Sequence, residues 1–303
     1  AMRRDRVSRI QPAPPQQTYG LSHAQKRLWL VDQLGDAASY NMPQAYLIHG
    51  DLDTQRMGEA LARIVQRHEI LRTAFVEIDG VPQQQVLNAI PLELEQLDLT
   101  DRADPESDAR DIIEEEAILP FDLAKPPLLR LKLLQLAQQK WVFLMNLHHI
   151  VGDGWSLNIL FRELVQIFNS LRDSERSELA PLRIQYKDFS EWQNHQPFVE
   201  EEKYWMARLA GNPTGIRLPF DFPPTDDRDF TGALETQQID GEVLEGLRTV
   251  ARSKQVTLAN LLLALFKLFL FRLTKQEDLC VGVSVAGRNH PDLERLIGFF
   301  VNV

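Results

Sequence analysis

The stretch that decides the fold is residues 141–156, which read WVFLMNLHHIVGDGWS. Its first five residues are all apolar, and a strand of this kind is typically buried on both faces near the middle of a sheet. A polar loop with two histidines, an aspartate and two glycines follows, and a helix is expected over residues 155–171. A buried strand that ends in such a loop is a suitable place for a firmly held set of reactive side chains.

The two histidines of this loop are expected to differ in their surroundings. If both continue the strand, the side chains of His148 and His149 point to opposite faces. One imidazole can then face a cleft as a neutral base, because its ordinary pKa is about 6.5 and burial lowers it. The other is structural, so the doublet is not a pair of bases side by side.

Two other interpretations of the loop compete with catalysis. A His-His-Asp cluster could bind a metal, but adjacent imidazoles diverge, and the sequence has no H-E-x-x-H or Cys-x-x-Cys companion. We therefore expect no metal. An isolated His-Asp loop could also be a hydrogen-bonded structure without chemistry. The sequence lacks the G-x-S-x-G, P-loop and G-x-G-x-x-G patterns, so nothing indicates a serine hydrolase or a nucleotide site.

Composition sets the class of protein and excludes one kind of partner. The chain has 303 residues, of which 44% are hydrophobic and 25% charged, as in ordinary soluble globular proteins, and it is long enough for two packed units. Its formal net charge of -10 repels phosphate backbones, so a nucleic-acid partner is not expected.

Two local features bear on location. Cys280 is the single cysteine, which fits a reducing cytoplasm. We expect it to be a small buried residue in a strand over 278–285 rather than a catalytic thiol. Residues 258–273 are strongly apolar but shorter than the ~20 residues that a membrane span needs. We expect a helix buried on most sides there, and no membrane association.

The order of the predicted elements indicates a mixed α/β fold, with sheets covered by helices. Before the central stretch we expect a helix capped by Ser22, a helix over 54–68 capped by Asp53, and a hairpin that turns at 79–80. The other expected elements are strands at 45–48, 128–136, 140–147, 234–239 and 278–285, and helices ending near 120 and at 187–193, 199–209, 241–254 and 257–273.

Composition also predicts the domain limits. Residues 1–20 contain three prolines and no apolar period, which predicts a linker or arm, or a tag remnant. A second polar break over 172–181 is where we place the boundary between two lobes, 21–177 and 178–303.

Five segments resemble a known family. Residues 148–154, HHIVGDG, resemble the H-H-x-x-x-D-G motif of the condensation domains of nonribosomal peptide synthetases, which belong to the chloramphenicol-acetyltransferase-like superfamily. The other matching segments are SHAQKRLW at 22–29, RHEILRTAF at 67–75, YKDFSEW at 186–192 and IGFFVN at 297–302. They follow the order of the family and cover nearly the whole chain.

The resemblance implies a fold, a reaction and partners. The fold would be two acetyltransferase-like lobes in a V, with the active site in a tunnel between them. A donor acyl group and an acceptor amine would arrive from opposite faces, each as a thioester on the phosphopantetheine arm of a carrier protein, and an amide bond would form. The domain itself would hold no cofactor. Its partners would be upstream donor and downstream acceptor carrier domains and an adenylation domain in the cytoplasm.

The resemblance also assigns residues. His149 matches the catalytic histidine, as a general base or as a group that positions the amine. Asp153 matches a structural aspartate that pairs with an arginine, here Arg288, and we expect a buried ion pair that joins the lobes. Further support is expected from His148 and from Gly154, where a glycine would allow close backbone approach. The candidates for the tunnel wall are Trp155 and Ser156.

Subtype and alternatives stay open at this point. The motifs resemble domains that join an L-configured donor to an L acceptor, and lipid-loading starter domains share many of these features. Family members continue past I-G-x-F-V-N, so the second lobe is expected to be incomplete here, and activity of the chain on its own is not predicted. The alternatives are a catalytically silent platform of the same fold, which binds carrier proteins or tailoring enzymes, and a coenzyme A-dependent acyltransferase.

Overall fold

The computed structural model describes residues 9–35, 38–173, 179–211, 215–222 and 234–303. The chain forms two compact units, one of residues 1–196 with 284–303 and one of residues 197–283. The lobe boundary expected after residue 177 falls at 174–178, outside the described residues, and stays a prediction.

The larger sheet of the first unit explains the apolar stretch at 141–145. Its strands lie in the order β2 (Asn41–His49), β7 (Lys140–His148), β6 (Leu129–Ala137) and β5 (Glu95–Asp98), and only the β5–β6 pair is parallel. β7 is an inner strand, as predicted, and every residue from 142 to 148 is buried.

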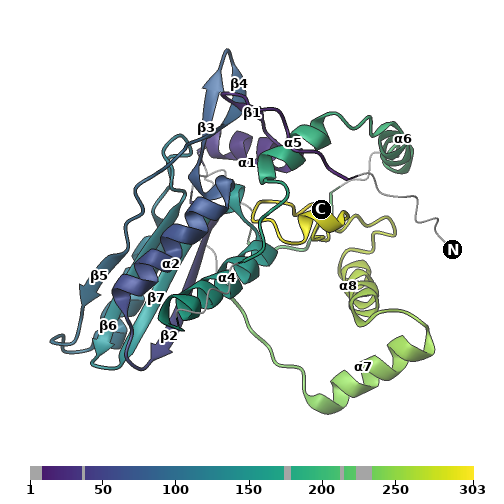
Figure 1. The fold of residues 1–303 in the computed structure, drawn as a ribbon. Coiled ribbons are helices and arrows are strands. Elements are labelled where there is room, and N and C mark those ends of the chain that lie inside the picture. Colours follow the sequence, from purple (N-terminus) through teal and green to yellow (C-terminus); the bar gives the residue numbers. More distant parts are fainter. Residues whose placement is uncertain (1–8, 36–37, 174–178, 212–214, 223–233) are drawn as a thin grey trace. The chain divides into compact units, whose positions relative to one another are not determined.

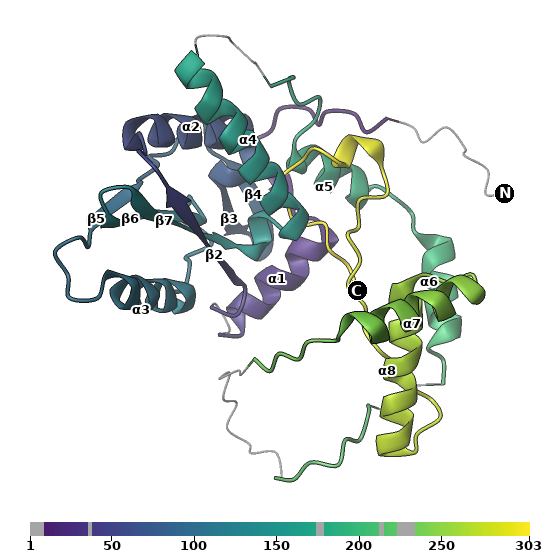
Figure 2. The ribbon, with the colours of Figure 1, turned by 90° about the horizontal axis from the view of Figure 1, so that it is seen from below.

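Both faces of this sheet are covered, which is why β7 is apolar at successive positions. One face, with Phe143 and Met145, packs in the main core against α2 (Thr54–Arg67) and α4 (Gly154–Asp173). The opposite face, with Val142, packs against α3 (Pro105–Ile118) in a smaller apolar cluster. Figure 1 shows α2 and α4 side by side on the sheet, and Figure 2 shows α3 on its other side.

The helix caps predicted from the sequence are present. The Ser22 hydroxyl accepts a hydrogen bond from the Gln25 amide, 3.1 Å away, at the start of α1 (His23–Gln33). Asp53 caps α2 in the same way, with the Arg56 amide at 2.9 Å. The buried face of α2 consists of the five residues that the helical period indicates, Met57, Ala60, Leu61, Ile64 and Val65.

A second, three-stranded sheet is built on the predicted hairpin. Its order is β1 (Tyr19–Gly20), β4 (Val81–Val86) and β3 (Thr73–Ile78), all antiparallel, and η1 (Glu69–Arg72) leads from α2 into it. Residues 9–20, the described part of the expected linker or arm, form an arm packed on the unit. Ile10 has no exposed surface, and the Ala13 amide donates to the Asp188 carboxylate at 2.9 Å.

The end of the chain returns to the first unit. Residues 284–303 contain η3 (Pro291–Leu293) and one antiparallel bridge between Val285 and Asn302. This segment lies against η2 (His149–Val151) and against α5 (Tyr186–Asn194), through contacts such as the rings of His149 with Phe299 and of Tyr186 with Phe300. His149 and Phe299, which are 150 positions apart in the sequence, therefore meet at the histidine loop.

The second unit differs most from the sequence prediction. It contains α6 (Val199–Arg208), α7 (Gly241–Ser253) and α8 (Leu258–Thr274). The strand expected at 234–239 is wrong, and 278–285 forms only the bridge at Val285. Strands exist only where another strand pairs with them, and apart from the bridge of Val285 to Asn302 no described segment pairs with these residues.

Two burial predictions for the second unit are also wrong. Of the residues of α8, all of which are described, only Leu270 is buried, although a helix buried on most sides was expected. Cys280 is exposed. In both cases the described part of the chain provides no surface that covers these side chains. Among the described residues, no single helix is long and apolar enough to cross a membrane, and the α7–α8 pair meets this test only together, with a bend of 103°.

Candidate active site

The histidine loop is fixed by its backbone at the point where β7 ends. The His148 amide donates to the Leu128 carbonyl at 3.1 Å, and the His149 amide donates to the Tyr40 carbonyl at 2.8 Å. The loop then passes through η2 into α4. Because the residues directly before β6 and β2 hold the two backbone amides, the backbone of the loop is fixed at both histidines.

His149 is half-buried and has one ring nitrogen occupied. Its Nδ1 lies 2.8 Å from the Gly152 carbonyl oxygen, and its ring meets Phe299 edge-on with 4.8 Å between the ring centres. A carbonyl oxygen only accepts hydrogen bonds, so Nδ1 carries the proton of the neutral imidazole. The lone pair is then on Nε2, which is the nitrogen available to accept a proton from a substrate.

His148 is buried, with 1% of its surface exposed. Its Nδ1 accepts a hydrogen bond from the Ile150 amide at 3.1 Å, and its ring packs edge-on against Phe121. Burial lowers the pKa of His148 to about 4, and the charges of His149 and Arg130 act in the same direction. His148 is therefore a neutral structural residue, and the predicted difference in exposure between the two histidines is confirmed.

Asp153 connects the histidine loop to the end of the chain. Its Oδ1 accepts from the amide and hydroxyl of Ser156, at 2.8 and 2.7 Å, and so caps the first turn of α4. Arg288 Nη2 donates to the same oxygen at 3.1 Å, and the Phe300 amide donates to Oδ2 at 3.1 Å. The carboxylate thus has partners from its own loop and from residues 284–303.

The ion pair predicted between Asp153 and Arg288 is present and buried. Their side chains are 1% and 2% exposed, respectively. Arg288 also donates to the carbonyls of Leu293 and Leu296, at 2.5 and 2.8 Å, and its guanidinium lies 4.1 Å from the Phe300 ring centre. Both residues belong to the first unit, so the pair fastens a late segment to the loop within one unit. Burial lowers the pKa of Arg288, and the charge of Asp153 opposes this shift.

The glycine that needs close approach is not the predicted one. A Cβ atom on Gly152 would lie 2.6 Å from Cδ2 of Leu147, whereas a Cβ on Gly154 would meet nothing within 4 Å. The close backbone approach expected at Gly154 is therefore wrong, because the helix start at this position faces open space. At Gly152 the backbone of the loop lies directly against the side chain of Leu147, a buried residue near the end of β7.

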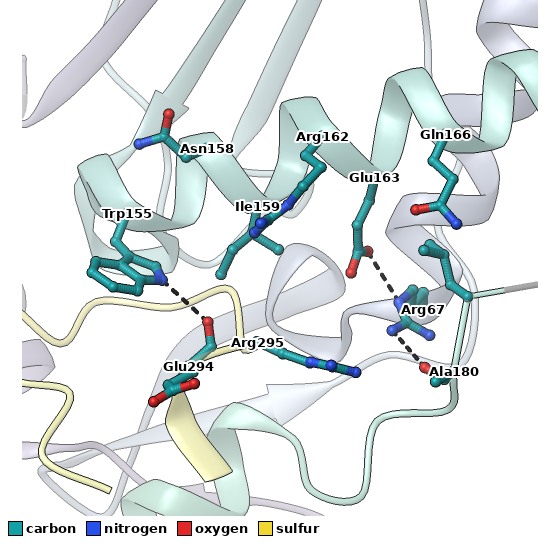
Figure 3. Close-up of a pocket in the computed structure, with 11 residues that line it drawn as sticks. Arg67, Trp155, Asn158, Ile159, Arg162, Glu163, Gln166, Ala180, Glu294 and Arg295 are labelled. Carbon is teal, nitrogen blue, oxygen red and sulfur yellow. Dashed lines mark hydrogen bonds and ion pairs between the residues drawn. The ribbon is translucent and has the colours of Figure 1, made fainter. Parts of the chain in front are cut away.

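The two tunnel candidates lie in different surroundings. Ser156 has no exposed surface, and its hydroxyl is used by Asp153, Arg288 and the backbone of Gly298, so it belongs to the ion-pair network rather than to an open wall. Trp155 is 48% exposed, and its indole nitrogen donates to the Glu294 carbonyl at 3.1 Å. Trp155 lines a pocket of about 810 Å³ along α4 (Figure 3).

Sequence reasoning missed one support of the site, a buried tyrosine. The Tyr186 hydroxyl donates to the Phe299 carbonyl at 2.5 Å and lies 2.8 Å from the Ser22 hydroxyl, and burial raises the pKa of Tyr186. Its ring occupies the space beside Gly298, where a Cβ atom would lie 1.9 Å from the ring. The motif segments at 22–29, 186–192 and 297–302 thus meet in one place. The signal available in the sequence was that Tyr186 is the first residue of one of these motif segments.

No metal centre is found in the part of the chain that the structure describes, where no group of three or more His, Cys, Asp or Glu side chains is arranged to hold an ion.

Comparison with known proteins gives a consistent result. A family model described as "Condensation domain" matches residues 15–303. The chain is 42% identical to a linear gramicidin synthase of Brevibacillus parabrevis and 38% identical to gramicidin S synthase 2 of Aneurinibacillus migulanus. Each match covers 97% of this chain, but only 4% and 6% of those proteins, so the chain spans a small part of the relatives' length.

Solved structures share the fold. The X-domain from teicoplanin biosynthesis gives a TM-score of 0.85 at 24% identity, over 97% of this chain and 66% of that one. The first condensation domain of the calcium-dependent antibiotic synthetase, in complex with a substrate analogue, gives 0.78 at 25% identity, over 94% and 68%. The mixed α/β fold predicted from the sequence, of the acetyltransferase-like type, is confirmed.

Proposed function

The chain belongs to the condensation-domain family, and we propose that it forms an amide bond between two substrates held as thioesters on carrier proteins of a nonribosomal peptide synthetase. Support comes from the family match over residues 15–303 and from relatives that are peptide synthases. The observation that carries the proposal is the half-buried His149, whose Nδ1 is engaged by the Gly152 carbonyl so that Nε2 is the free acceptor.

The proposed reaction is an aminolysis. The nitrogen of the acceptor amine attacks the carbonyl carbon of the donor thioester, the C–N bond forms, and the C–S bond breaks. The proton lost by the amine passes by way of His149 Nε2 to the departing thiolate, and the lengthened chain stays on the acceptor carrier. A thioester is already activated, so an imidazole that only orients the amine would also lower the barrier.

The other site residues would hold His149 in position, by fixing the backbone of its loop or by packing against its ring. Asp153 and Arg288 hold the loop that starts α4, and Phe299, which touches the His149 ring, is part of the same C-terminal segment. His148 fills the core below with a neutral ring. These residues position the catalytic group, and none of them needs to change its protonation state during the reaction.

Partners follow from the same proposal. An upstream donor carrier and a downstream acceptor carrier would deliver the substrates on phosphopantetheine arms, beside an adenylation domain and in the cytoplasm, and the domain would need no cofactor of its own. In a solved four-domain nonribosomal peptide synthetase, a part that makes up 22% of that chain is similar in fold to 98% of this one. We favour an L-configured donor, with a lipid-loading starter reaction as the alternative subtype.

The test is dipeptide formation by the intact protein that contains this chain, supplied with an aminoacyl donor carrier and an aminoacyl acceptor carrier. We expect a dipeptide on the acceptor carrier. A silent platform of the same fold would bind both carriers and form no product. A coenzyme A-dependent acyltransferase would use acyl-coenzyme A as well as the loaded donor, and either result would contradict the proposal.

A further inference from the structure

The hydroxyl of Tyr186, the first residue of α5, is a buried donor to the C-terminal segment, which Figures 1 and 2 both show beside this helix. It donates to the Phe299 carbonyl at 2.5 Å. Because a hydroxyl has a single proton, its contact of 2.8 Å with the Ser22 hydroxyl is one in which Ser22 donates. Burial raises the pKa of Tyr186, so the phenol keeps its proton and stays a donor.

The start of α1 fixes both the tyrosine and the histidine loop. Ser22 is the N-cap of this helix, and its hydroxyl oxygen accepts from the Gln25 amide at 3.1 Å. The Gln25 side chain, which has no exposed surface, donates from Nε2 to the Ile150 carbonyl at 3.2 Å. Ile150 directly follows His149, so one helix start holds the backbone beside the imidazole and the hydroxyl that reaches the C-terminal segment.

The backbone around Phe299 is held on both sides. The amide of Phe300, which belongs to the same peptide group as the Phe299 carbonyl, donates to Asp153 Oδ2 at 3.1 Å. The amide of Gly298 donates to the Ser156 hydroxyl oxygen, also at 3.1 Å. The tyrosine therefore completes a set of hydrogen bonds that leaves the Phe299 backbone little freedom.

The ring of Phe299 is the surface against which the His149 imidazole lies. The two rings meet at 65° with 4.8 Å between their centres, and Phe299 is only 8% exposed. His149 Nδ1 is held at 2.8 Å from the Gly152 carbonyl oxygen. Since rotation of an imidazole about its Cβ–Cγ bond has broad minima, the hydrogen bond and the ring contact together define the direction of Nε2.

We propose that the Tyr186 hydroxyl is a positioning group for His149, which fixes the Phe299 carbonyl and thereby keeps the Phe299 ring against the imidazole; its effect on catalysis rests on the proposed function. Without the hydroxyl, a buried carbonyl loses its donor, which is unfavourable, and the segment moves to recover a partner. The imidazole then loses the surface that directs Nε2.

The rate test uses Tyr186→Phe, which removes one oxygen and keeps the ring beside Gly298. In the intact protein we expect kcat for dipeptide formation to fall about tenfold, as for a small displacement of a catalytic group, with the KM for both loaded carriers unchanged. Tyr19→Phe is the matched control, because Tyr19 is also buried and its hydroxyl accepts from the Gln16 amide of the N-terminal arm at 3.0 Å. It should keep the full kcat. Wild-type kcat in a folded Tyr186→Phe variant would overturn the proposal.

The His149→Ala background separates positioning from a general effect on the fold. If Tyr186 acts through His149, adding Tyr186→Phe leaves the residual rate of His149→Ala unchanged. A further loss as large as that in the wild-type background would show that the tyrosine acts elsewhere.

Thermal unfolding shows whether each variant is folded. Should Tyr186→Phe fail to fold, Phe299→Leu takes its place, because it removes the ring contact and keeps the hydroxyl with its carbonyl. We expect the same loss in kcat, and wild-type kcat in Phe299→Leu would overturn the proposal.

Chemical modification of His149 tests the positioning without the reaction. Diethyl pyrocarbonate acylates the unprotonated nitrogen of an imidazole, and mass spectrometry of peptides from the intact protein gives the rate at each histidine. Tyr186→Phe should raise the rate at His149 severalfold, because the imidazole is less confined, and leave the rate at the exposed His49 unchanged. Equal rates at His149 in both proteins would overturn the proposal. A wild-type protein that forms no dipeptide refutes the proposed function, and the modification rates then decide on the role of Tyr186 alone.

Discussion

Oδ1 of Asp153 lies 3.1 Å from Nη2 of Arg288, a residue 135 positions later in the chain. Both side chains are almost completely buried. The carboxylate caps α4 directly after the histidine loop, and the guanidinium donates to the carbonyls of Leu293, the last residue of η3, and of Leu296. One ion pair therefore couples the direction of His149 to a segment at the far end of the sequence.

Breaking this pair on one side should cost more than removing both partners. We expect Asp153→Asn or Arg288→Met to lower the free energy of unfolding by about 3–5 kcal/mol, because an uncompensated charge or polar group stays buried. The double variant should lose less than the sum of the two. A double-mutant cycle by urea unfolding of the intact protein measures this coupling.

The exposed pair of Arg63 and Glu59 on α2 is the control for this cycle, and we expect a coupling free energy of about 0.5 kcal/mol or less there. Additive losses at Asp153 and Arg288 would contradict the expectation.

Replacing His149 should affect the reaction rather than the fold. We expect His149→Ala to lower the rate of dipeptide formation by at least about 10²-fold, as for other positioned acid–base groups. The free energy of unfolding should change little, because His149 is only half-buried. His49→Ala, at an exposed histidine at the end of β2, is the matched control and should keep the full rate. Condensation at wild-type rate by the His149 variant would remove this residue from the mechanism.

His148 should make stability depend on pH. Its pKa is lowered from 6.5 to about 4 in the folded protein, so below pH 6.5 the unfolded chain binds a proton that the folded chain refuses. The stability is full above pH 6.5 and falls as the pH drops toward 4, by about 3 kcal/mol in all. Urea unfolding between pH 7.5 and 4 measures the total loss of stability over this range, which should be smaller by about 3 kcal/mol in His148→Gln. Equal losses in the two proteins would show that His148 is not the group responsible.

An added methyl group should destabilise the protein at one glycine near the site and have little effect at another. Gly298→Ala would place Cβ 1.9 Å from the Tyr186 ring, and we expect a loss of about 1–3 kcal/mol in the free energy of unfolding. Gly154→Ala meets open space and should leave stability nearly unchanged. Thermal unfolding of the two variants provides the comparison. The reverse order, with Gly154→Ala the more damaging, would contradict the close contact of Tyr186 with Gly298.

Local patterns in the sequence were sufficient for the elements that carry His149. The apolar run at 141–145 gave the inner strand, and Ser22 and Asp53 gave the starts of two helices. The alternation of side chains gave the different surroundings of His148 and His149. These features depend on residues a few positions apart, so periodicity and capping chemistry report them directly. The partner of Asp153 came from the resemblance to a family.

Tertiary structure decided what depends on distant parts of the chain. No local pattern shows that Tyr186 fills the space beside Gly298, or that the Ser156 hydroxyl accepts a hydrogen bond from the Gly298 amide. The same reason explains the errors at 234–239 and in α8. A strand needs a partner strand and an apolar helix needs a covering surface, and the residues themselves are equally apolar whether or not that neighbour is present.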